Sequence, residues 1–283
     1  GLEDGLKGKG FSGAVGTSAS FATLIGVDNL VDFQSGLAKK LGFVFFDVVT
    51  QTYPRIQDYQ VLTSLSGLGA ILYKMAFDLR ILQSPVYSEL AEPFGENQVG
   101  SSAMPFKQNP IKAEKINSLG RYLAQLPRIA WDNAAHSLLE RTLDDSANRR
   151  TILPEAFLAA EEMLQVCSEI FSDLQVFENG IRQNLEDYGP FAATEKLLMV
   201  LARAGADRQK MHQVLRKHAL QAWSAVREGK SNPMIELVST DINLLEFITK
   251  KEISRAMEGS VYLGDAAERA KNLSDKIKIE ISG

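Results

Sequence analysis

The feature that most constrains the fold is a long run of apolar side chains, spaced three and four positions apart, that ends at Ser84–Pro85. Its members are Val61, Leu62, Leu65, Leu68, Leu72, Met75, Leu79 and Leu82. Residues three and four apart share one face of an α-helix, so this spacing predicts a long helix with one buried face. The helix should end at Ser84–Pro85, because a proline disfavours helical backbone in the residue before it.

The rest of the first half favours helix or loop. We expect helices over Asp28–Leu41 and Ile111–Leu126, and a short strand over Phe43–Val49. Residues 1–26 are rich in Gly, Ser, Thr and Lys, and Glu89–Pro110 is punctuated by prolines and glycines, so both are expected to be loops. Loops as long as the second are often functional.

Prolines and glycines divide the second half of the chain. Pro154 is expected to be the first residue of a helix, where its missing N–H costs no hydrogen bond. The buried face of that helix is expected to contain Phe157, Met163, Leu164, Cys167, Ile170 and Leu174. From about Val176 onward we expect shorter helices, broken at Gly189–Pro190, Gly205 and Asn232–Pro233.

These patterns predict an all-α fold, with a bundle of long helices over residues 1–176 and a smaller helical domain over residues 177–283. Long helices with wide apolar stripes need partners, and so few of them would leave much apolar surface exposed in a monomer. The pattern therefore favours an oligomer.

Composition limits the partners and the compartment. A net charge of −4 gives no basic footprint, so no nucleic-acid partner is expected. The single cysteine, Cys167, can form neither an internal disulfide nor a cysteine metal cluster, which fits the reducing cytoplasm. No signal peptide opens the chain, and no apolar run approaches the ~18 residues that a membrane span needs. The first residue is Gly1 rather than Met, so we expect the gene product to start upstream.

Residues 100–110 read G-S-S-A-M-P-F-K-Q-N-P. In an arbitrary loop this would be a polar turn with an exposed lysine. The string nevertheless resembles, at every defined position, the signature G-S-S-x-M-P-x-K-x-N-P of the fumarase–aspartase superfamily, whose members eliminate fumarate from a C–N or C–O bond.

That resemblance assigns roles to individual side chains. It implies that Ser101 is the catalytic base, that Lys107 and Asn109 contact the fumaryl part of the substrate, and that Ser102 and Met104 are further substrate contacts. Removing a proton next to a carboxylate creates a dianion, which Lys107 and loop N–H groups would stabilise. Position 108 is a glutamine where one family of the superfamily usually has arginine.

Glu114 follows this motif at the start of the expected helix. In the superfamily a glutamate at this position orients the general-acid histidine, so the resemblance implies a catalytic role. A glutamate in the first turn is also favoured by the helix dipole. One residue could serve both purposes, and both interpretations stay open.

Residues 140–150 read E-R-T-L-D-D-S-A-N-R-R. A self-neutralising charge cluster at a helix boundary is the ordinary interpretation. This string, however, is very similar to a pattern of the adenylosuccinate lyase family. The similarity implies that Arg141, Ser146 and Arg150 bind the nucleotide phosphate and that Leu143 contacts the substrate. Guanidinium groups suit phosphate oxygens because they donate two parallel hydrogen bonds.

Two weaker motifs lie upstream. Residues 50–55 read T-Q-T-Y-P-R and resemble a family segment whose glutamine contacts the succinyl group, which implies that role for Gln51. Alone, such a segment is an ordinary turn before a proline. Residues 12–17 read S-G-A-V-G-T and resemble a glycine-rich stretch that lines the family's site.

The family's general acid is a histidine in a T-H-x-Q-x-A-type segment, which this sequence lacks. The three histidines are His136, His212 and His218, and none lies in such a context. His218 is expected to be a buried, hydrogen-bonded core residue and His212 to be solvated. The resemblance implies that an N-terminal part of the family's chain is missing, so residues 1–283 alone are expected to be inactive.

The resemblance implies a carbon–nitrogen lyase of the amidine-lyase type in purine biosynthesis. It would convert adenylosuccinate to AMP and fumarate, and would release fumarate from the succinylated carboxamide ribotide. No metal and no organic cofactor are implied, and the sites of the homotetramer would be shared between subunits. Two alternatives stay open: another fumarate-releasing lyase of the superfamily, and a non-catalytic helical oligomerisation scaffold.

Overall fold

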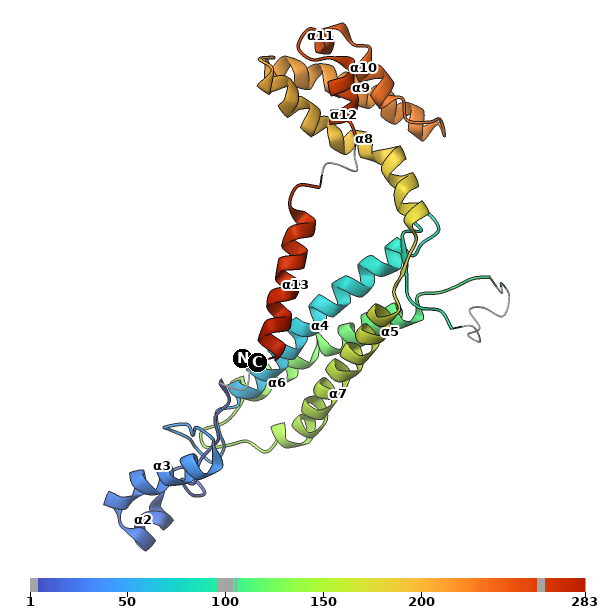
Figure 1. Ribbon diagram of the computed structural model, residues 1–283. Coiled ribbons are helices and arrows are strands. Elements are labelled where there is room, and N and C mark those ends of the chain that lie inside the picture. Colours follow the sequence, from blue (N-terminus) through green and yellow to red (C-terminus); the bar gives the residue numbers. More distant parts are fainter. Residues whose placement is uncertain (1–4, 96–103, 105, 259–262, 283) are drawn as a thin grey trace. The chain divides into compact units, whose positions relative to one another are not determined.

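The protein is described by a computed structural model that covers residues 5–95, 104, 106–258 and 263–282 (Figure 1). These residues are mainly helical, which confirms the all-α prediction. They form two compact units. The first comprises Gly1–Pro85 and Leu90–Val176, and the second comprises Val86–Glu89 and Phe177–Gly283.

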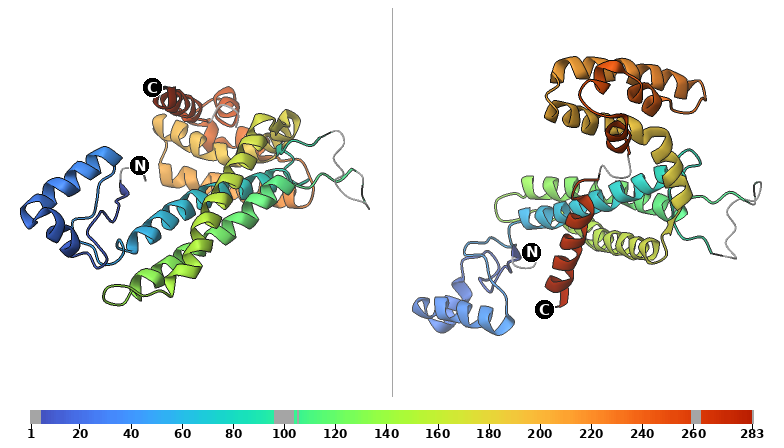
Figure 2. Two further views of the ribbon diagram at one scale, coloured as in Figure 1. Left: turned by 90° about the horizontal axis from the view of Figure 1, so that it is seen from below. Right: turned by 45° about the horizontal axis from the view of Figure 1, so that its top comes forward.

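The first unit contains a bundle of four helices: α4 (Ile56–Leu82), α5 (Ile111–Leu123), α6 (Leu126–Ala135) and α7 (Asp145–Ser172). Helix α4 packs against the other three, and α5 also packs against α7 (Figures 1 and 2). The predicted apolar face of α4 is confirmed, because all of its members except the half-buried Leu82 are buried or packed against the core. The largest fully buried side chains of this core are Leu62, Ile116, Leu123, Met163 and Ile170.

Two glycines allow α4 and α5 to approach closely. A Cβ atom on Gly69 of α4 would lie 2.9 Å from Cδ2 of Leu123. A Cβ atom on Gly120 of α5 would lie 3.0 Å from Cδ2 of Tyr73 on α4. Each helix therefore presents a glycine to a large side chain of the other.

The residues before α4 differ from expectation in two places. Residues 1–26 were expected to be a loop, yet they contain α2 (Ala19–Ile25), which is followed by the 3₁₀ helix η1 (Val27–Asn29) and by α3 (Leu30–Leu41). The strand expected over Phe43–Val49 is reduced to one parallel bridge between Gly8 and Phe45. A β-rich run needs a hydrogen-bonded neighbour along its length, and here only that bridge is present.

Helix α7 also differs from what the sequence predicted. It begins at Asp145 and contains Pro154 in its interior, although Pro154 was expected to open it. Proline removes one intrahelical hydrogen bond, but tertiary contacts of the preceding turns hold this part of the helix. Among them is a reciprocal amide pair in which Asn133 and Asn148 each donate to the other, at 2.7 and 2.9 Å.

The face of α7 that packs against the core is also narrower than expected. Met163 and Ile170 are fully buried as expected, and Cys167 packs partly buried against them. Phe157 and Leu164 were expected on the same face, but they are 50% and 46% exposed. The expected face was therefore too wide.

A short antiparallel ladder joins the bundle's end to the loop that follows α4. Strand β1 (Leu90–Ala91) pairs antiparallel with β2 (Gln175–Val176), with Leu90 opposite Val176 and Ala91 opposite Gln175. The chain between α4 and α5 is thereby tied to the C-terminal end of α7.

The second unit contains α8 (Glu178–Arg203), α9 (Arg208–Arg227), α10 (Met234–Ser239), α11 (Ile242–Leu245), α12 (Lys250–Ala256) and α13 (Ala266–Ser282). Gly189–Pro190 does not break α8, because both residues are buried within the continuous helix. The breaks at Gly205 and at Asn232–Pro233 are confirmed. His218 Nε2 lies 2.7 Å from Asp241 Oδ2, as expected for a hydrogen-bonded core histidine.

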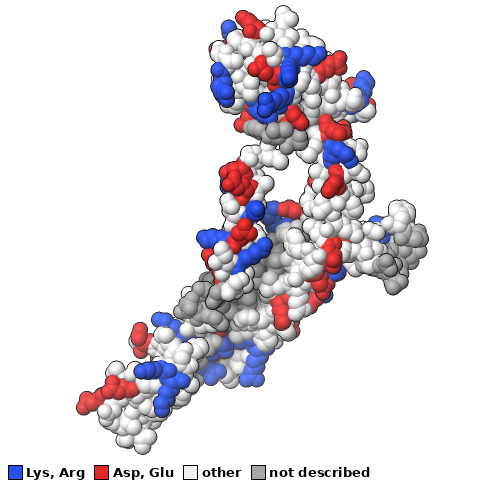
Figure 3. Space-filling view, viewed as in Figure 1, with Lys and Arg blue, Asp and Glu red and all other residues white. Residues whose placement is uncertain are grey.

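The surface carries both signs of charge, and Lys and Arg are interspersed with Asp and Glu on the face shown in Figure 3. None of the helices in the described part of the chain combines the length and hydropathy that a bilayer span requires. Among the same residues, no group of His, Cys, Asp and Glu side chains is arranged to hold a metal ion.

The two faces of α7 should differ in their contribution to stability. Met163→Ala should lower the free energy of unfolding by about 2–5 kcal/mol, because it removes a fully buried side chain and leaves a cavity. Leu164→Ala, one position away and half-exposed, is the matched control and should cost clearly less. Urea unfolding measures both. Equal losses would show that α7 is buried on both faces.

Candidate active site

The residues expected to act on the substrate divide into two groups at opposite ends of α4. Gln51 precedes α4, and Arg141, Leu143, Ser146 and Arg150 lie at the start of α7, beside that end. Met104, Lys107, Asn109 and Glu114 lie near the other end, where α5 begins. Because α4 has 27 residues at 1.5 Å of rise per residue, the groups are roughly 40 Å apart.

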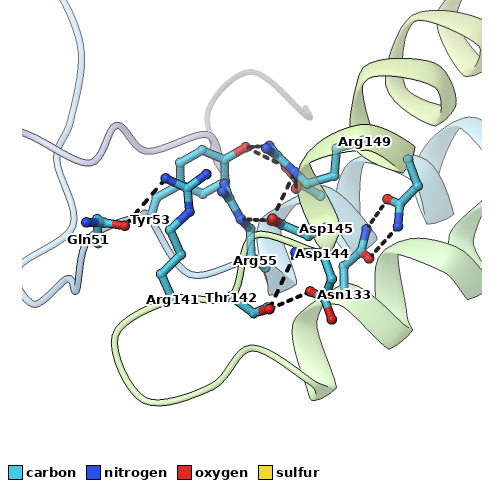
Figure 4. Close-up of polar contacts among 11 residues, drawn as sticks. Gln51, Tyr53, Arg55, Asn133, Arg141, Thr142, Asp144, Asp145 and Arg149 are labelled. Atoms are coloured by element: carbon cyan, nitrogen blue, oxygen red, sulfur yellow. Dashed lines mark hydrogen bonds and ion pairs between the residues drawn. The ribbon is translucent and has the colours of Figure 1, made fainter.

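At the N-terminal end of α4, the structure brings together two of the expected residues. Arg141 Nη1 donates to Gln51 Oε1 at 3.4 Å (Figure 4). Both side chains are exposed. The guanidinium expected to hold phosphate therefore lies beside the amide expected to hold the succinyl group.

The other members of this group lie around the first turns of α7. Leu143 and Arg150 are exposed and Ser146 is half-buried. Ser146 N donates to Leu143 O at 3.1 Å, which fixes the turn into the helix. Ser146 and Arg150 are four positions apart and so share one side of α7.

Beneath these exposed residues lies a network of buried charges (Figure 4). Arg55 Nε donates to Asp145 Oδ2 at 2.7 Å, and both side chains are buried. Arg149 Nε donates to Asp58 Oδ2 at 2.6 Å. These two ion pairs join the start of α4 to the start of α7.

Tyr53 completes the network. Its hydroxyl donates to Asp58 Oδ1 at 2.6 Å and accepts from Arg149 Nη2 at 2.6 Å. Burial, reinforced by the hydrogen bond to Asp58, raises the pKa of Tyr53 above its ordinary value, so the phenol keeps its proton and continues to donate. The segment that contains Gln51 is thereby anchored to the segment that contains Arg141.

An open pocket of about 450 Å³ adjoins this network. Its lining includes Thr50, Tyr53, Arg55, Trp131 and Leu139. Its aromatic and aliphatic walls suit the apolar ring of a ligand.

At the other end of α4, a second open pocket of about 570 Å³ contains most of the signature residues that are described. Lys107, Asn109 and Glu114 line it together with Arg80 of α4 and with Gln83, which follows α4. Glu114 lies in the first turn of α5, as expected for a glutamate favoured by the helix dipole. Met104 is exposed nearby in sequence, whereas Ser101 and Ser102 lie outside the described residues.

Arg80 holds the glutamate of this pocket. Its Nη1 donates to Asn117 Oδ1 at 3.0 Å and its Nη2 approaches Glu114 Oε1 at 3.5 Å. Two cationic side chains, Arg80 and Lys107, therefore face one pocket. Such a pocket can bind carboxylates.

Sequence reasoning did not single out Arg149, Tyr53, Asp58 or Arg80. Arg149 lies within the recognised 140–150 string, but its neighbour Arg150 was chosen for the ligand. A usable signal was the spacing of Asp145 and Arg149, four positions apart on one helix face. Arg149 lies far from Tyr53 in sequence, as do the partners of Arg80, and no local pattern indicates these contacts.

Comparisons with known proteins find matches in both halves of the chain. The family profile described as "Lyase" matches residues 11–122, and the one described as "Adenylosuccinate lyase C-terminus" matches residues 190–273. A crystal structure of a fumarate lyase from Mesorhizobium sp. BNC1 has a TM-score of 0.75 at 23% identity, over 93% of this chain and 56% of that one. That likeness supports the fold.

Curated relatives are more similar in sequence. An adenylosuccinate lyase of Caenorhabditis briggsae is 42% identical over 224 residues, which are 78% of this chain and 46% of that protein. One of Saccharomyces cerevisiae is 37% identical over 274 residues, or 95% of this chain and 56% of that protein. The chain thus spans about half the length of the curated relatives it matches. It belongs to the adenylosuccinate lyase family of the fumarase–aspartase superfamily.

Proposed function

We propose that this chain is part of a carbon–nitrogen lyase that converts adenylosuccinate to AMP and fumarate. We propose that the same site releases fumarate from the succinylated carboxamide ribotide of purine biosynthesis. The observation that carries the proposal is the contact between Arg141 and Gln51. It joins the motif assigned to the phosphate with the motif assigned to the succinyl group.

The proposed reaction is a β-elimination. Ser101 removes a proton from the carbon next to a carboxylate, the C–N bond breaks, and the leaving nitrogen takes a proton from a general acid. Lys107 stabilises the dianion that forms on the carboxylate, and Asn109 fixes the fumaryl group. Ser102 and Met104 are assigned to substrate contact, and Glu114 to orienting the acid.

At the nucleotide end, Arg141, Ser146 and Arg150 are proposed to bind the phosphate, and Leu143 to contact the substrate. Guanidinium groups make charge-assisted hydrogen bonds to phosphate oxygens. The first turns of a long helix add a favourable dipole for an anion. The buried network beneath supports this role, because it holds both motifs in place.

The distance between the two groups has a consequence for assembly. Ends of α4 that are roughly 40 Å apart cannot reach one adenylosuccinate molecule. We therefore propose a homotetramer in which one copy supplies the Lys107 end of a site and another supplies the Arg141 end.

The reaction moves protons without a change in oxidation state, so we propose no metal or organic cofactor. The proposed cytoplasmic location rests on cysteine usage.

The role of the base predicts one outcome. In the active enzyme that contains this chain, Ser101→Ala should lower the rate of fumarate release by ~10²–10⁴-fold or more, because a catalytic base contributes about that much. Substrate binding should persist. Ser118→Ala, an exposed serine on α5, is the matched control. A Ser101→Ala enzyme that retained half of its activity would remove this serine from the mechanism.

The phosphate contacts predict selective losses. Arg141→Ala and Arg150→Ala should each weaken AMP binding by roughly 1.5–3 kcal/mol, the value of a charge-assisted hydrogen bond. Fumarate binding should change little. Arg121→Ala, at an exposed site on α5, is the control. Titration calorimetry measures both ligands, and equal losses for AMP and fumarate would assign the arginines a structural role. Unchanged AMP binding would favour another lyase of the superfamily.

From the surroundings of the three histidines we predict that residues 1–283 alone release no fumarate from adenylosuccinate. Elimination needs an acid for the departing nitrogen. His218 is bonded to Asp241, His136 Nδ1 lies 2.8 Å from its own helix at Asp132 O, and His212 is exposed on α9. An absorbance assay for fumarate, with and without an added segment containing the family's acid histidine, tests this. Robust turnover by the chain alone would mean that His136 or another group of this chain is the acid, whereas no turnover with the segment would favour a non-catalytic scaffold.

A further inference from the structure

We propose that Gln83 and Glu92 form a clasp that positions Lys107 and Asn109 for the reaction. This role rests on the proposed function. Neither residue belongs to the recognised motifs. Gln83 follows the last residue of α4, and Glu92 follows β1. Together they connect the chain before residues 96–103 to the chain after them.

Glu92 is a buried carboxylate, 1% exposed. Its Oε1 accepts from Lys112 N at 3.0 Å and its Oε2 accepts from Ala113 N at 2.9 Å. These N–H groups lie in the first turn of α5, where no intrahelical acceptor exists. Burial raises the pKa of Glu92, while the bonds from Lys112 and Ala113 act to lower it. Because Lys112 and Ala113 both donate N–H groups, each of the two Glu92 side-chain oxygens must be a hydrogen-bond acceptor.

The local sequence explains why the first turn of α5 is capped by a carboxylate from a distant position in the chain. The residue at the cap position of α5 is Pro110, which makes no side-chain cap. A serine, threonine or aspartate there would satisfy the helix locally. Here the first turn depends on Glu92, which lies before the signature motif. The positions of α5 and of Asn109 thus depend on the chain segment around Glu92, which lies before residues 96–103 in sequence.

Gln83 provides the second connection. Its Oε1 accepts from Glu92 N at 3.1 Å, and its Nε2 donates to Gln108 O at 3.2 Å. Gln108 lies between Lys107 and Asn109, so this amide holds the backbone that carries both proposed substrate contacts. The side chain at position 108 needs no charge for this purpose, because the bond is to its carbonyl.

The geometry separates this clasp from ordinary core packing. Four hydrogen bonds from two side chains end on backbone groups of residues 92–113. All of them fix the backbone around the pocket that contains Lys107, Asn109 and Glu114. Loss of the clasp should therefore move the proposed substrate contacts more than it unfolds the bundle.

Glu92→Gln tests the clasp, because the new amide places an NH₂ group where one helix N–H needs an acceptor. Hydrogen exchange should accelerate about tenfold or more at whichever of the Lys112 and Ala113 amides faces the NH₂ group, as expected when a buried donor loses its partner. Glu155→Gln makes the same chemical change at an exposed site on α7 and should leave these amides unaffected. Unchanged exchange in the Glu92→Gln protein would overturn the clasp itself.

Steady-state kinetics of the active enzyme that contains this chain test the positioning role. Glu92→Gln and Gln83→Met should each lower kcat for fumarate release about tenfold, while the dissociation constant of AMP stays within about twofold, because the phosphate group lies at the other end of α4. The double variant should lower kcat by a smaller factor than the product of the two single-variant factors, since both residues hold the same backbone segments.

The outcomes separate the clasp from the proposed function. If exchange accelerates but kcat per folded enzyme is unchanged, Glu92 is a helix cap and the positioning role is wrong. If Glu92→Gln fails to fold, Gln83→Met decides, since Gln83 is only half-buried. If the unmodified enzyme releases no fumarate, the proposed function fails and the positioning role with it, while the exchange experiment still decides whether the clasp exists.

Discussion

The length and rigidity of α4 govern the rest of the first unit. A helix of 27 residues is roughly 40 Å long, and its buried face packs against α5, α6 and α7 along that length. Polar groups at its two ends are therefore held far apart by a packed core that cannot bend to bring them together. Any ligand that needs both groups must meet them on different copies of the chain.

At the N-terminal end of α4, the side chains that anchor the backbone are close in sequence to the exposed ones. Tyr53 is two residues from Gln51, and Arg149 is adjacent to Arg150. Buried charges are costly unless they are paired, and removing one partner of such a pair typically costs about 3–5 kcal/mol. Arg55, Asp58, Asp145 and Arg149 each have a partner of opposite charge, so the network is tolerated in the interior.

How far the sequence predicts this structure depends on where the determining contacts lie. The buried face of α4 was predictable, because it depends on local spacing, and so was the break at Gly205. The interior positions of Pro154 and Pro190 were not, since contacts from distant segments hold those helices together. In the site, the motifs indicated Gln51, Arg141, Lys107 and Asn109. The contacts of Glu92 were not predictable, because its partners, Lys112 and Ala113, lie about 20 residues away on the other side of a loop.

The proposed division of the site between copies would also explain why the exposed residues lie next to buried anchoring contacts. Under the proposed function, groups from separate chains must meet around one substrate, and a misplacement of about 1 Å can cost 10²-fold in rate. Contacts within one chain can adjust together when a loop shifts, but contacts across copies cannot. Each end must then be rigid on its own. The buried ion pairs meet that requirement at the Arg141 end, and Glu92 with Gln83 meets it at the Lys107 end.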